Sequence, residues 1–282
     1  MSEIGNIQWF PGHMTKTRRL IEADLKMVDA VVEITDARIP ESSRNPILDE
    51  LVKDKPRIMI LNKCDYADER MTAAWKRFYE QRGMTVITCD CRSGKGINRF
   101  LPTVKNMLSE LIERRKARGM VGKALRLMVV GIPNVGKSSF INRMANSKKT
   151  KVGDRPGVTR GKQWVSIDRD VELLDMPGIL WPKFDDQTAA QRLAYTGAIK
   201  DDVMDVEALA RGLGELLKAD YPDLLKARYK IPCEGDILTE IAKARGMLVS
   251  GGEPDTERAA AALLDEYRGG RIGKITLEAP QE

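Results

Sequence analysis

Short apolar runs alternate with amphipathic stretches along the first 178 residues of the chain. Six runs have the length and composition of buried strands: Asp29–Thr35, Arg57–Leu61, Met84–Thr88, Leu125–Val130, Gln163–Ile167 and Val171–Leu174. Apolar residues recur at helical spacing in the stretches Thr15–Lys26, Arg70–Arg82, Ile97–Arg118 and Lys137–Ala145. Strands that alternate with helices favour an α/β domain built on a mostly parallel sheet.

After Gly178 the pattern becomes helical, and the one later strand candidate is the short tail Ile272–Leu277. Helices are predicted at Thr188–Lys200, Val203–Lys218, Ile237–Arg245 and Thr256–Arg268. We therefore predict two domains, an α/β domain over residues 1–178 and a small all-α C-terminal domain over residues 179–282.

Composition excludes several classes of protein. The chain has 282 residues, of which 42% are hydrophobic and 31% charged, so it can bury a core. No stretch approaches ~20 apolar residues, which predicts that no segment spans a membrane, and the start MSEIGNIQWF lacks a secretory pattern. Because there is no secretory pattern, we expect a cytoplasmic protein whose four cysteines are reduced thiols. A zinc site is not expected, because it would lack a convincing C-x-x-C pair and a second histidine.

The net charge of +6 is unevenly distributed. Residues 1–178 hold 33 basic and 22 acidic side chains, whereas residues 179–282 hold 14 and 19. The basic excess therefore belongs to the α/β domain, where it permits contact with an anionic partner such as a phosphate backbone.

A glycine-rich segment follows the run Leu125–Val130 and opens a predicted helix. Residues Gly131–Ser138, GIPNVGKS, fit the phosphate-loop pattern G-x-x-x-x-G-K-[ST]. Main-chain N–H groups of such a loop surround phosphate oxygens, Lys137 reaches the β- and γ-phosphates, and the Ser138 hydroxyl binds Mg²⁺. The residues predicted to bind nucleotide here are Asn134, Val135, Gly136, Lys137, Ser138 and Ser139.

A second polar motif, Asn62-Lys63-Cys64-Asp65, directly follows the run Arg57–Leu61. N-K-x-D at this position resembles the guanine-recognition motif of GTPases. The Asp65 carboxylate can accept hydrogen bonds from guanine N1–H and from the exocyclic amine, whereas adenine offers neither donor. Asp90 and Cys91, after the run Met84–Thr88, are predicted to form a second base-binding loop.

Two segments fit the pattern D-x-x-G, and their positions decide between them. Only Asp175 ends an apolar run, so its carboxylate is predicted to reach Mg²⁺ through water and the Gly178 N–H to sense the γ-phosphate. The other match, Asp154–Gly157, lies away from any strand end. Thr159 is the candidate switch threonine that closes over Mg²⁺.

The order of these motifs is rotated relative to that of ordinary GTPases, because N-K-C-D precedes the phosphate loop. The sequence therefore resembles the circularly permuted GTPases that assist bacterial ribosome assembly. The resemblance extends over nearly the whole chain and rests on WFPGHM, DARIPESSRNP, NKCD, GIPNVGKSS, PGVTRG and DMPGILWP. It implies a P-loop GTPase fold and GTP hydrolysis to GDP, stimulated by the ribosomal subunit. It also implies late assembly of the large subunit, with the helical domain contacting rRNA and ribosomal proteins.

The resemblance also suggests two less usual roles. Ordinary GTPases carry a glutamine after D-x-x-G to orient water, but this chain has Ile179 there. By resemblance, His13 is the candidate that activates water, with a group supplied by a partner as the alternative. Asn134 resembles residues of GTPases that are activated by K⁺, although it can equally be a structural asparagine.

Two other functions fit the same motifs. The chain can be a GTP-binding scaffold whose turnover is incidental, which the apolar Ile179 also suits. It can instead be a GTPase that acts on another RNA, such as tRNA.

Overall fold

The computed structural model describes residues 14–120, 122–146, 163–178, 180, 186–201 and 204–281. These residues form two compact units. The α/β unit holds the described residues from 14 to 180 together with 278–281, and the helical unit holds those from 186 to 277. The sequence placed the boundary after residue 178 and assigned the whole C-terminus to the helical part, whereas the last residues belong to the α/β unit.

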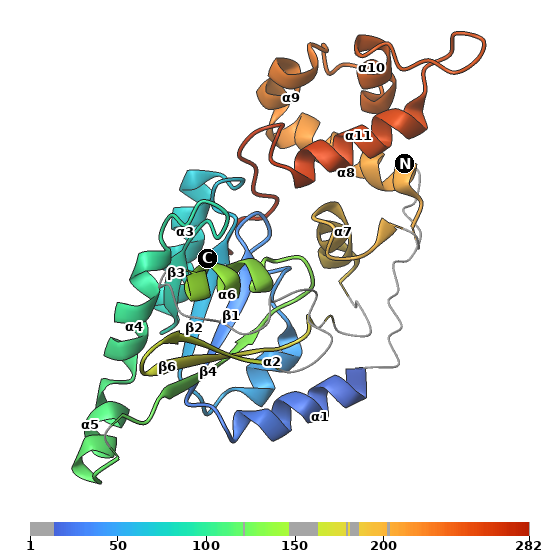
Figure 1. Ribbon diagram of the computed structural model, residues 1–282. Coiled ribbons are helices and arrows are strands. Elements are labelled where there is room, and N and C mark those ends of the chain that lie inside the picture. The colour runs from blue at the N-terminus through green and yellow to red at the C-terminus, as the bar shows by residue number, and fades with distance from the viewer. Residues whose placement is uncertain are drawn as a thin grey trace. The chain divides into compact units, whose positions relative to one another are not determined.

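A six-stranded sheet forms the centre of the α/β unit (Figure 1), with the order β3-β2-β1-β4-β6-β5. Its strands are β1 (Ala30–Asp36), β2 (Arg57–Asn62), β3 (Thr85–Thr88), β4 (Leu125–Val130), β5 (Gln163–Asp168) and β6 (Val171–Asp175). All are parallel except β5, which pairs antiparallel with β6 in a hairpin. The six predicted strands are thus confirmed, and the carboxyl ends of five of them meet at one edge of the sheet.

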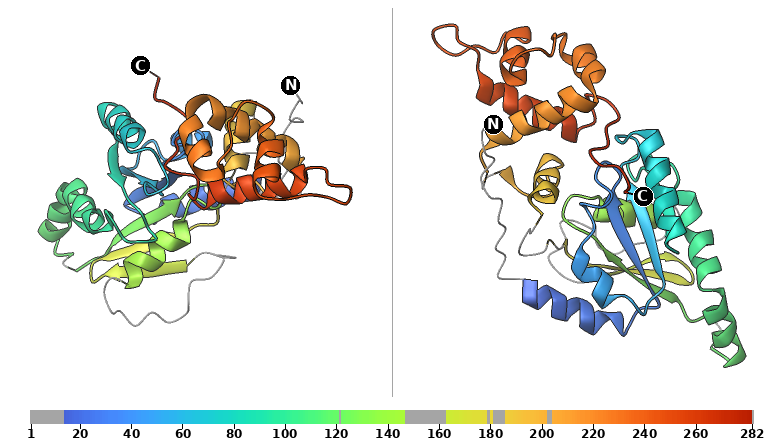
Figure 2. Two further views of the ribbon diagram at one scale, coloured as in Figure 1. Left: turned by 90° about the horizontal axis from the view of Figure 1, so that it is seen from above. Right: turned by 180° about the vertical axis from the view of Figure 1, so that it is seen from behind.

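Helices cover both faces of this sheet (Figures 1 and 2). The helices of this unit are α1 (Met14–Leu25), α2 (Pro46–Leu51), α3 (Glu69–Gln81), the 3₁₀ turn η1 (Ile97–Arg99), α4 (Phe100–Met107), α5 (Ser109–Ala117), which buries no side chain, and α6 (Lys137–Asn146). One face packs against α1, α2 and α3 through two apolar clusters, the second of which contains Trp75 and Tyr79. On the other face α4 and α6 meet through an edge-to-face pair of Phe100 and Phe140. Because both faces are covered, the central strands are almost wholly buried.

The helices of this unit differ from the sequence prediction in two places. The single helix expected over Ile97–Arg118 is divided into η1, α4 and α5, because the backbone leaves the helical region at Leu108 (φ −101°, ψ 16°). Helix α2 was not predicted, although its start has a clear local cause. The Asn45 side chain accepts a hydrogen bond from Ile47 N, and Pro46 occupies the first turn, where its missing N–H costs nothing.

The helical unit consists of α7 (Gln187–Tyr195), α8 (Val206–Asp220), α9 (Pro222–Tyr229), α10 (Ile237–Ala244) and α11 (Thr256–Arg268). Four of these helices begin with an aspartate whose side chain accepts from main-chain N–H groups of the first turn. These N-caps are Asp186, Asp205, Asp236 and Asp255. The buried Glu266 of α11 binds Arg228 and Arg245, so an ion-pair network joins three elements of the unit.

The strand expected at Ile272–Leu277 is wrong, and so is the predicted end of the first helix in this unit. Helix α7 stops at Tyr195 rather than Lys200. Residues 272–277 pair with no strand in the described part of the chain. Instead the Tyr221 hydroxyl donates to Thr276 O (2.9 Å) and accepts from Thr276 N (3.2 Å). A side chain thus satisfies main-chain groups that a strand ladder would otherwise pair.

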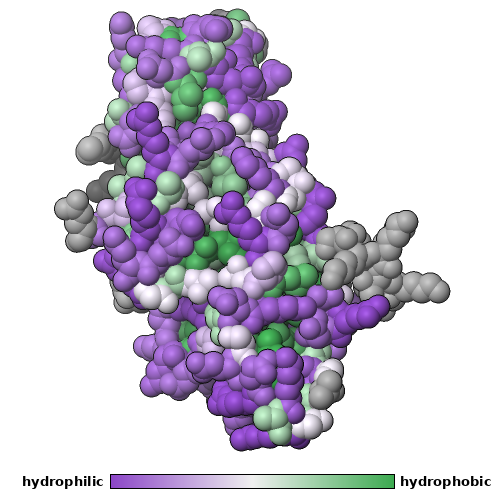
Figure 3. Space-filling model, turned by 90° about the vertical axis from the view of Figure 1, so that its left-hand side faces the viewer, coloured by the Kyte–Doolittle hydropathy of each residue, from purple (hydrophilic) through white to green (hydrophobic). Residues whose placement is uncertain are grey.

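The surface carries mainly polar side chains on the face drawn in Figure 3, where hydrophobic residues form small, separate areas. Among the described helices, none combines the length and the hydropathy needed to cross a bilayer.

Candidate nucleotide-binding site

The predicted motifs converge because they follow parallel strands of one sheet. The phosphate loop follows β4, N-K-C-D follows β2, the loop with Asp90 follows β3, and Asp175 ends β6. The register places Asp36, the last residue of β1, directly beside Asn62. In open α/β sheets ligands bind outside the carboxyl ends of the strands, so this edge is the candidate site.

The phosphate loop has the backbone of an anion cradle. Gly131, Asn134 and Gly136 have positive φ angles of 151°, 60° and 99°. At Gly136 a side chain is excluded as well, because a Cβ there would overlap the Asn62 amide. The loop then opens α6, whose N-terminus favours negative charge.

Lys137 is the buried cation of this loop. Its side chain is 8% exposed, and its Nζ donates to Gly131 O (2.9 Å) and Ile132 O (2.8 Å). Burial lowers the pKa of Lys137 to about 8, although the nearby Asp175 opposes this shift. The ammonium group is therefore held by main-chain carbonyls at the position where a P-loop binds phosphate.

Gly178 approaches the same lysine from the D-x-x-G segment. A Cβ at this position would lie 2.9 Å from both Lys137 Nζ and Pro133 N. The close approach requires glycine, and it places the Gly178 main chain beside the phosphate loop. Asp175 is buried at the end of β6. Ser138 is half-buried at the start of α6, and Ser139 is exposed.

Asn62 connects three loops of the site. Its Nδ2 donates to Val135 O of the phosphate loop at 2.7 Å, and its Oδ1 accepts from Cys91 N at 3.1 Å. The same Oδ1 lies 3.8 Å from the Cys89 thiol. The side chain of the first N-K-C-D residue therefore fixes the base loop and the phosphate loop relative to each other.

Lys63 adopts the left-handed conformation (φ 61°), and its Nζ forms an ion pair with Asp36 at 2.8 Å. Burial lowers the pKa of Lys63, and Asp36 opposes the shift. Burial alone would raise the pKa of Asp36, but Arg38 and Lys63 together hold it far below its ordinary value. The cation of the N-K-C-D motif is thus fixed by a buried carboxylate before any ligand binds.

Asp65 and Asp90 lie close enough to influence each other. Burial and the neighbouring Asp90 carboxylate raise the pKa of Asp65. The Asp90 carboxylate accepts from Arg92 N (2.7 Å) and Ser93 N (3.1 Å), so it closes its own loop. Cys64 is half-buried and donates its main-chain N–H to Cys89 O at 3.3 Å.

Sequence reasoning assigned no individual role to Asp36, Arg38 and Ser43. Arg38 is 1% exposed and forms two parallel hydrogen bonds with Asp36, of 3.0 Å from Nε and 2.8 Å from Nη2. The Ser43 hydroxyl accepts from Asp36 N at 2.9 Å. The position of Asp36 in the sequence could have indicated that it belongs to the site, because Asp36 follows an apolar run in the same way as Asn62 and Asp175 do.

The structure gives less information on the other predicted site residues. Asn134 is exposed on the phosphate loop. His13 and Thr159 lie outside the residues that the structure describes, as does Ile179. Cys64, Cys89, Cys91 and Cys233 are free thiols.

Comparison with known proteins identifies similar sequences over nearly the full length. Residues 126–213 match a family model described as "50S ribosome-binding GTPase". The chain is 45% identical to ribosome biogenesis GTPase A of Bacillus licheniformis over 98% of this chain and 99% of that protein. It is 32% identical to ribosome biogenesis GTPase A of Thermotoga maritima, covering 98% and 95% of the two chains.

Two solved structures are also similar. A GDP-bound structure of TM YlqF has a TM-score of 0.67 at 27% identity, covering 94% of this chain and 100% of that one. GNP-bound YlqF from T. maritima has a TM-score of 0.66 at 27% identity, with coverage of 95% and 99%.

Proposed function

We propose that this chain, which belongs to the ribosome biogenesis GTPase A family, acts at a late step in the assembly of the large ribosomal subunit. The chain is a ribosome-assembly GTPase with a circularly permuted P-loop fold, and it hydrolyses GTP to GDP and phosphate. Support for the large subunit comes from the family model over residues 126–213, whose description refers to the 50S ribosome.

One observation supports guanine nucleotide binding most directly. Asn62 joins the phosphate loop, the N-K-C-D motif and the base loop through hydrogen bonds to Val135 O and Cys91 N. These contacts support a site in which the phosphate cradle and the N-K-C-D motif bind one nucleotide, and we assign Asp65 as the acceptor for guanine N1–H. Adenine has no N1–H donor, so an unpaired carboxylate would reject it.

Positioning and electrostatics are proposed to drive hydrolysis. Lys137 binds the β- and γ-phosphates, and the Gly178 N–H senses the γ-phosphate. Mg²⁺ fits the donor set at this edge, because a serine hydroxyl and a carboxylate are the hard oxygen ligands that it prefers. We assign Ser138 and Thr159 as its ligands and Asp175 as a ligand through water. When bound, the ion neutralises charge that develops on the phosphate oxygens.

Two further roles follow from the family resemblance. His13 is proposed to orient or deprotonate the attacking water, since imidazole titrates near neutral pH. Asn134 is proposed to help bind a K⁺ ion that stimulates turnover. The proposed partners are rRNA and ribosomal proteins of the large subunit, and the basic excess of residues 1–178 favours contact with phosphate backbone.

The test measures GTP turnover by the full chain alone and with purified large subunits, small subunits or tRNA. We expect strong stimulation by the large subunit only. In the same assay His13→Ala should lose the stimulation while its affinity for GDP stays unchanged, and Na⁺ in place of K⁺ should slow turnover.

Each other outcome has a distinct meaning. Stimulation by tRNA alone would favour a GTPase that acts on another RNA. Nucleotide binding without stimulation by any RNA would favour a GTP-binding scaffold. Unchanged stimulated turnover in His13→Ala would exclude His13 as the group that activates water.

A further inference from the structure

The C-terminal tail returns to the α/β unit at Glu278. Residue 277 still belongs to the helical unit, whereas residues 278–281 belong to the α/β unit. Glu278 is 8% exposed, although it lies near the end of the chain, where side chains are usually solvated. A buried carboxylate at such a position must be compensated by donors.

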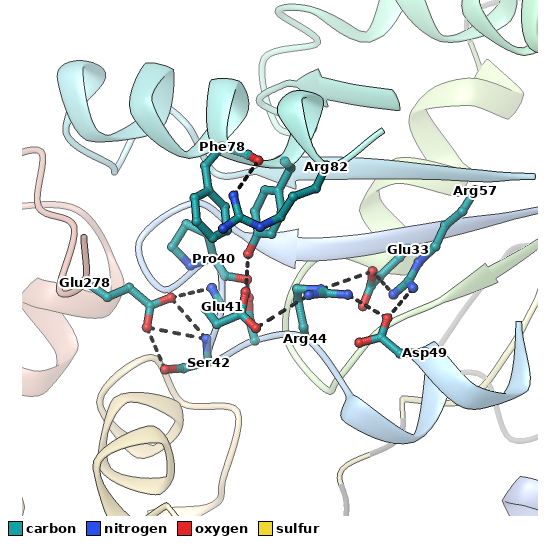
Figure 4. A network of polar contacts seen from close by, with 12 residues as sticks. Glu33, Pro40, Glu41, Ser42, Arg44, Asp49, Arg57, Phe78, Arg82 and Glu278 are labelled. Atoms are coloured by element: carbon teal, nitrogen blue, oxygen red, sulfur yellow. Dashed lines mark hydrogen bonds and ion pairs between the residues drawn. The ribbon is translucent and has the colours of Figure 1, made fainter. Parts of the chain in front are cut away.

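The donors come from the loop that follows β1 (Figure 4). The Glu278 carboxylate accepts from Glu41 N, from Ser42 N at 3.1 Å and from the Ser42 hydroxyl at 2.6 Å. In addition, the main-chain carbonyl of Glu278 accepts from Trp75 Nε1 of α3 at 2.9 Å. The tail is therefore attached both by its side chain and by its backbone.

The same loop supports the cation of the N-K-C-D motif. Ser43, next to the docked Ser42, accepts from Asp36 N at 2.9 Å, and Asp36 pairs with Lys63 at 2.8 Å. Only one peptide unit and these two polar contacts separate the Glu278 attachment from Lys63. Charge-assisted hydrogen bonds to main-chain N–H groups fix a loop more firmly than neutral ones do.

The rest of the loop is anchored independently of the tail. The Tyr79 hydroxyl donates to the Glu41 side chain at 2.7 Å, and Arg44 binds Asp49 at 2.6 Å. Arg57 pairs with both Asp49 and the buried Glu33 (Figure 4). Loss of the Glu278 carboxylate should therefore loosen the main chain at Ser42 and Ser43 without unfolding the unit.

We propose that Glu278 is a positioning residue for the guanine side of the nucleotide site, acting through Ser42, Ser43 and Asp36 on Lys63. This inference rests on the proposed function, in which the N-K-C-D motif that contains Lys63 binds the guanine base. It makes the affinity for guanine nucleotides depend on the docking of a tail that directly continues the helical unit. Because Lys63 lies on the base side, the effect falls equally on GDP and GTP.

The experiment measures dissociation constants of the full-length chain for GDP and for a non-hydrolysable GTP analogue. Glu278→Ala should raise both constants by the same factor, roughly three- to tenfold. Ser42→Ala removes one donor and should act in the same direction by a smaller factor. Gln281→Ala is the matched control, because Gln281 is an exposed residue of the same tail and should leave both constants unchanged.

Epistasis separates positioning from a purely structural role. In a Lys63→Ala background, Glu278→Ala should cause no further loss of affinity, since the residue it positions is already absent. A full additional loss in that background, or unchanged constants in Glu278→Ala alone, would overturn the proposal even if the thermal unfolding temperature falls. If the Lys63→Ala variant bound GDP normally, the role of Lys63 in binding the base would be wrong instead. Failure of the Glu278 proposal and failure of the role of Lys63 can therefore be distinguished.

Discussion

The two lysines of the nucleotide site are held in opposite ways. On the base side, Lys63 is paired with the buried carboxylate of Asp36. On the phosphate side, Lys137 donates to the main-chain carbonyls of Gly131 and Ile132. Within the described part of the chain, Lys137 forms no ion pair, and its pKa is lowered to about 8 by burial.

The two lysines therefore differ in whether a carboxylate of the protein or the bound nucleotide supplies their counter-charge. The charge of Lys63 is neutralised before the base arrives, so its ion pair fixes the geometry of the loop. Main-chain carbonyls carry only partial charges, so most of the positive charge of Lys137 remains available to a phosphate. The base side is thus preorganised by a direct ion pair, whereas Lys137 gains a directly bonded counter-charge only from the nucleotide.

The largest predicted effect concerns selection of the base. Asp65→Asn replaces an acceptor with an amide donor that faces the exocyclic amine of guanine, leaving a polar group unpaired. We expect the affinity for GDP to fall roughly a thousandfold. Xanthosine diphosphate, which has a carbonyl at that position, should bind the variant more tightly than GDP does.

Equilibrium titration of both nucleotides tests this prediction. Asp68→Asn is the matched control, because Asp68 lies three residues away and caps α3, a role that asparagine also fills. If Asp65→Asn retained its preference for guanine, another residue would have to recognise the base.

A smaller effect is expected when the preorganised ion pair is broken. Asp36→Asn removes the carboxylate that pairs with both Lys63 and the buried Arg38. We expect dissociation constants for GDP and GTP to rise equally, by roughly tenfold. The free energy of unfolding should fall by about 3 kcal/mol, because a buried ion pair then loses its negative partner.

Asp29→Asn provides a control at the opposite end of β1. Asp29 pairs with Arg115 and accepts from Arg126 N, far from the motif-bearing edge. This variant should lose stability in urea unfolding while its nucleotide affinity stays normal. A selective loss of GTP but not GDP in Asp36→Asn would contradict the assignment of Lys63 to the base side.

Most of the fold follows from local patterns. Buried apolar runs define all six strands, and each phosphate or base motif directly follows one of them, so their convergence could be predicted. The errors occurred where pattern gives little information. Helix α9 was not predicted, because it has only eight residues. The apolar pattern of the tail Ile272–Leu277 predicts a strand, but the Tyr221 hydroxyl holds this tail instead of a neighbouring strand.

The support of the base side could not be predicted for a different reason. The Glu278 carboxylate and the Ser42 hydroxyl are separated by 236 residues. Ser42 lies in the segment DARIPESSRNP, to which the sequence assigned no chemistry, and Glu278 lies in none of the motifs. Contacts of this kind depend on where the chain returns after a whole intervening unit. The predicted Asn62, by contrast, is positioned by the end of its own strand.

The smallest predicted effect tests the phosphate side through pH. Because Lys137 has a pKa of about 8 in the free protein, it loses its proton as the pH rises above that value. Bound phosphate favours the charged form, so nucleotide binding takes up a proton in this range. Affinity for GDP should therefore fall by about fourfold between pH 7 and pH 8.5.

Stability of the free protein should change in the opposite direction. The unfolded chain binds this proton up to the ordinary lysine pKa of 10.5, whereas the folded chain releases it from about pH 8. Between these values the unfolded state holds more protons, so the Lys137 contribution makes folding more favourable as the pH rises. Lys137→Met should abolish both trends, which separates them from the titration of other groups.

Calorimetry in buffers of different ionisation enthalpy measures the proton uptake directly. Measurements stop at pH 8.5, because guanine itself loses its N1 proton at higher pH. The wild-type chain should take up a fraction of a proton per GDP at pH 8.5, and the Lys137→Met variant should take up less. Higher protein and nucleotide concentrations compensate for the weaker binding of the variant. Equal uptake by both proteins would mean that Lys137 is already fully charged in the free protein. The contrast with Lys63 would then rest on geometry alone.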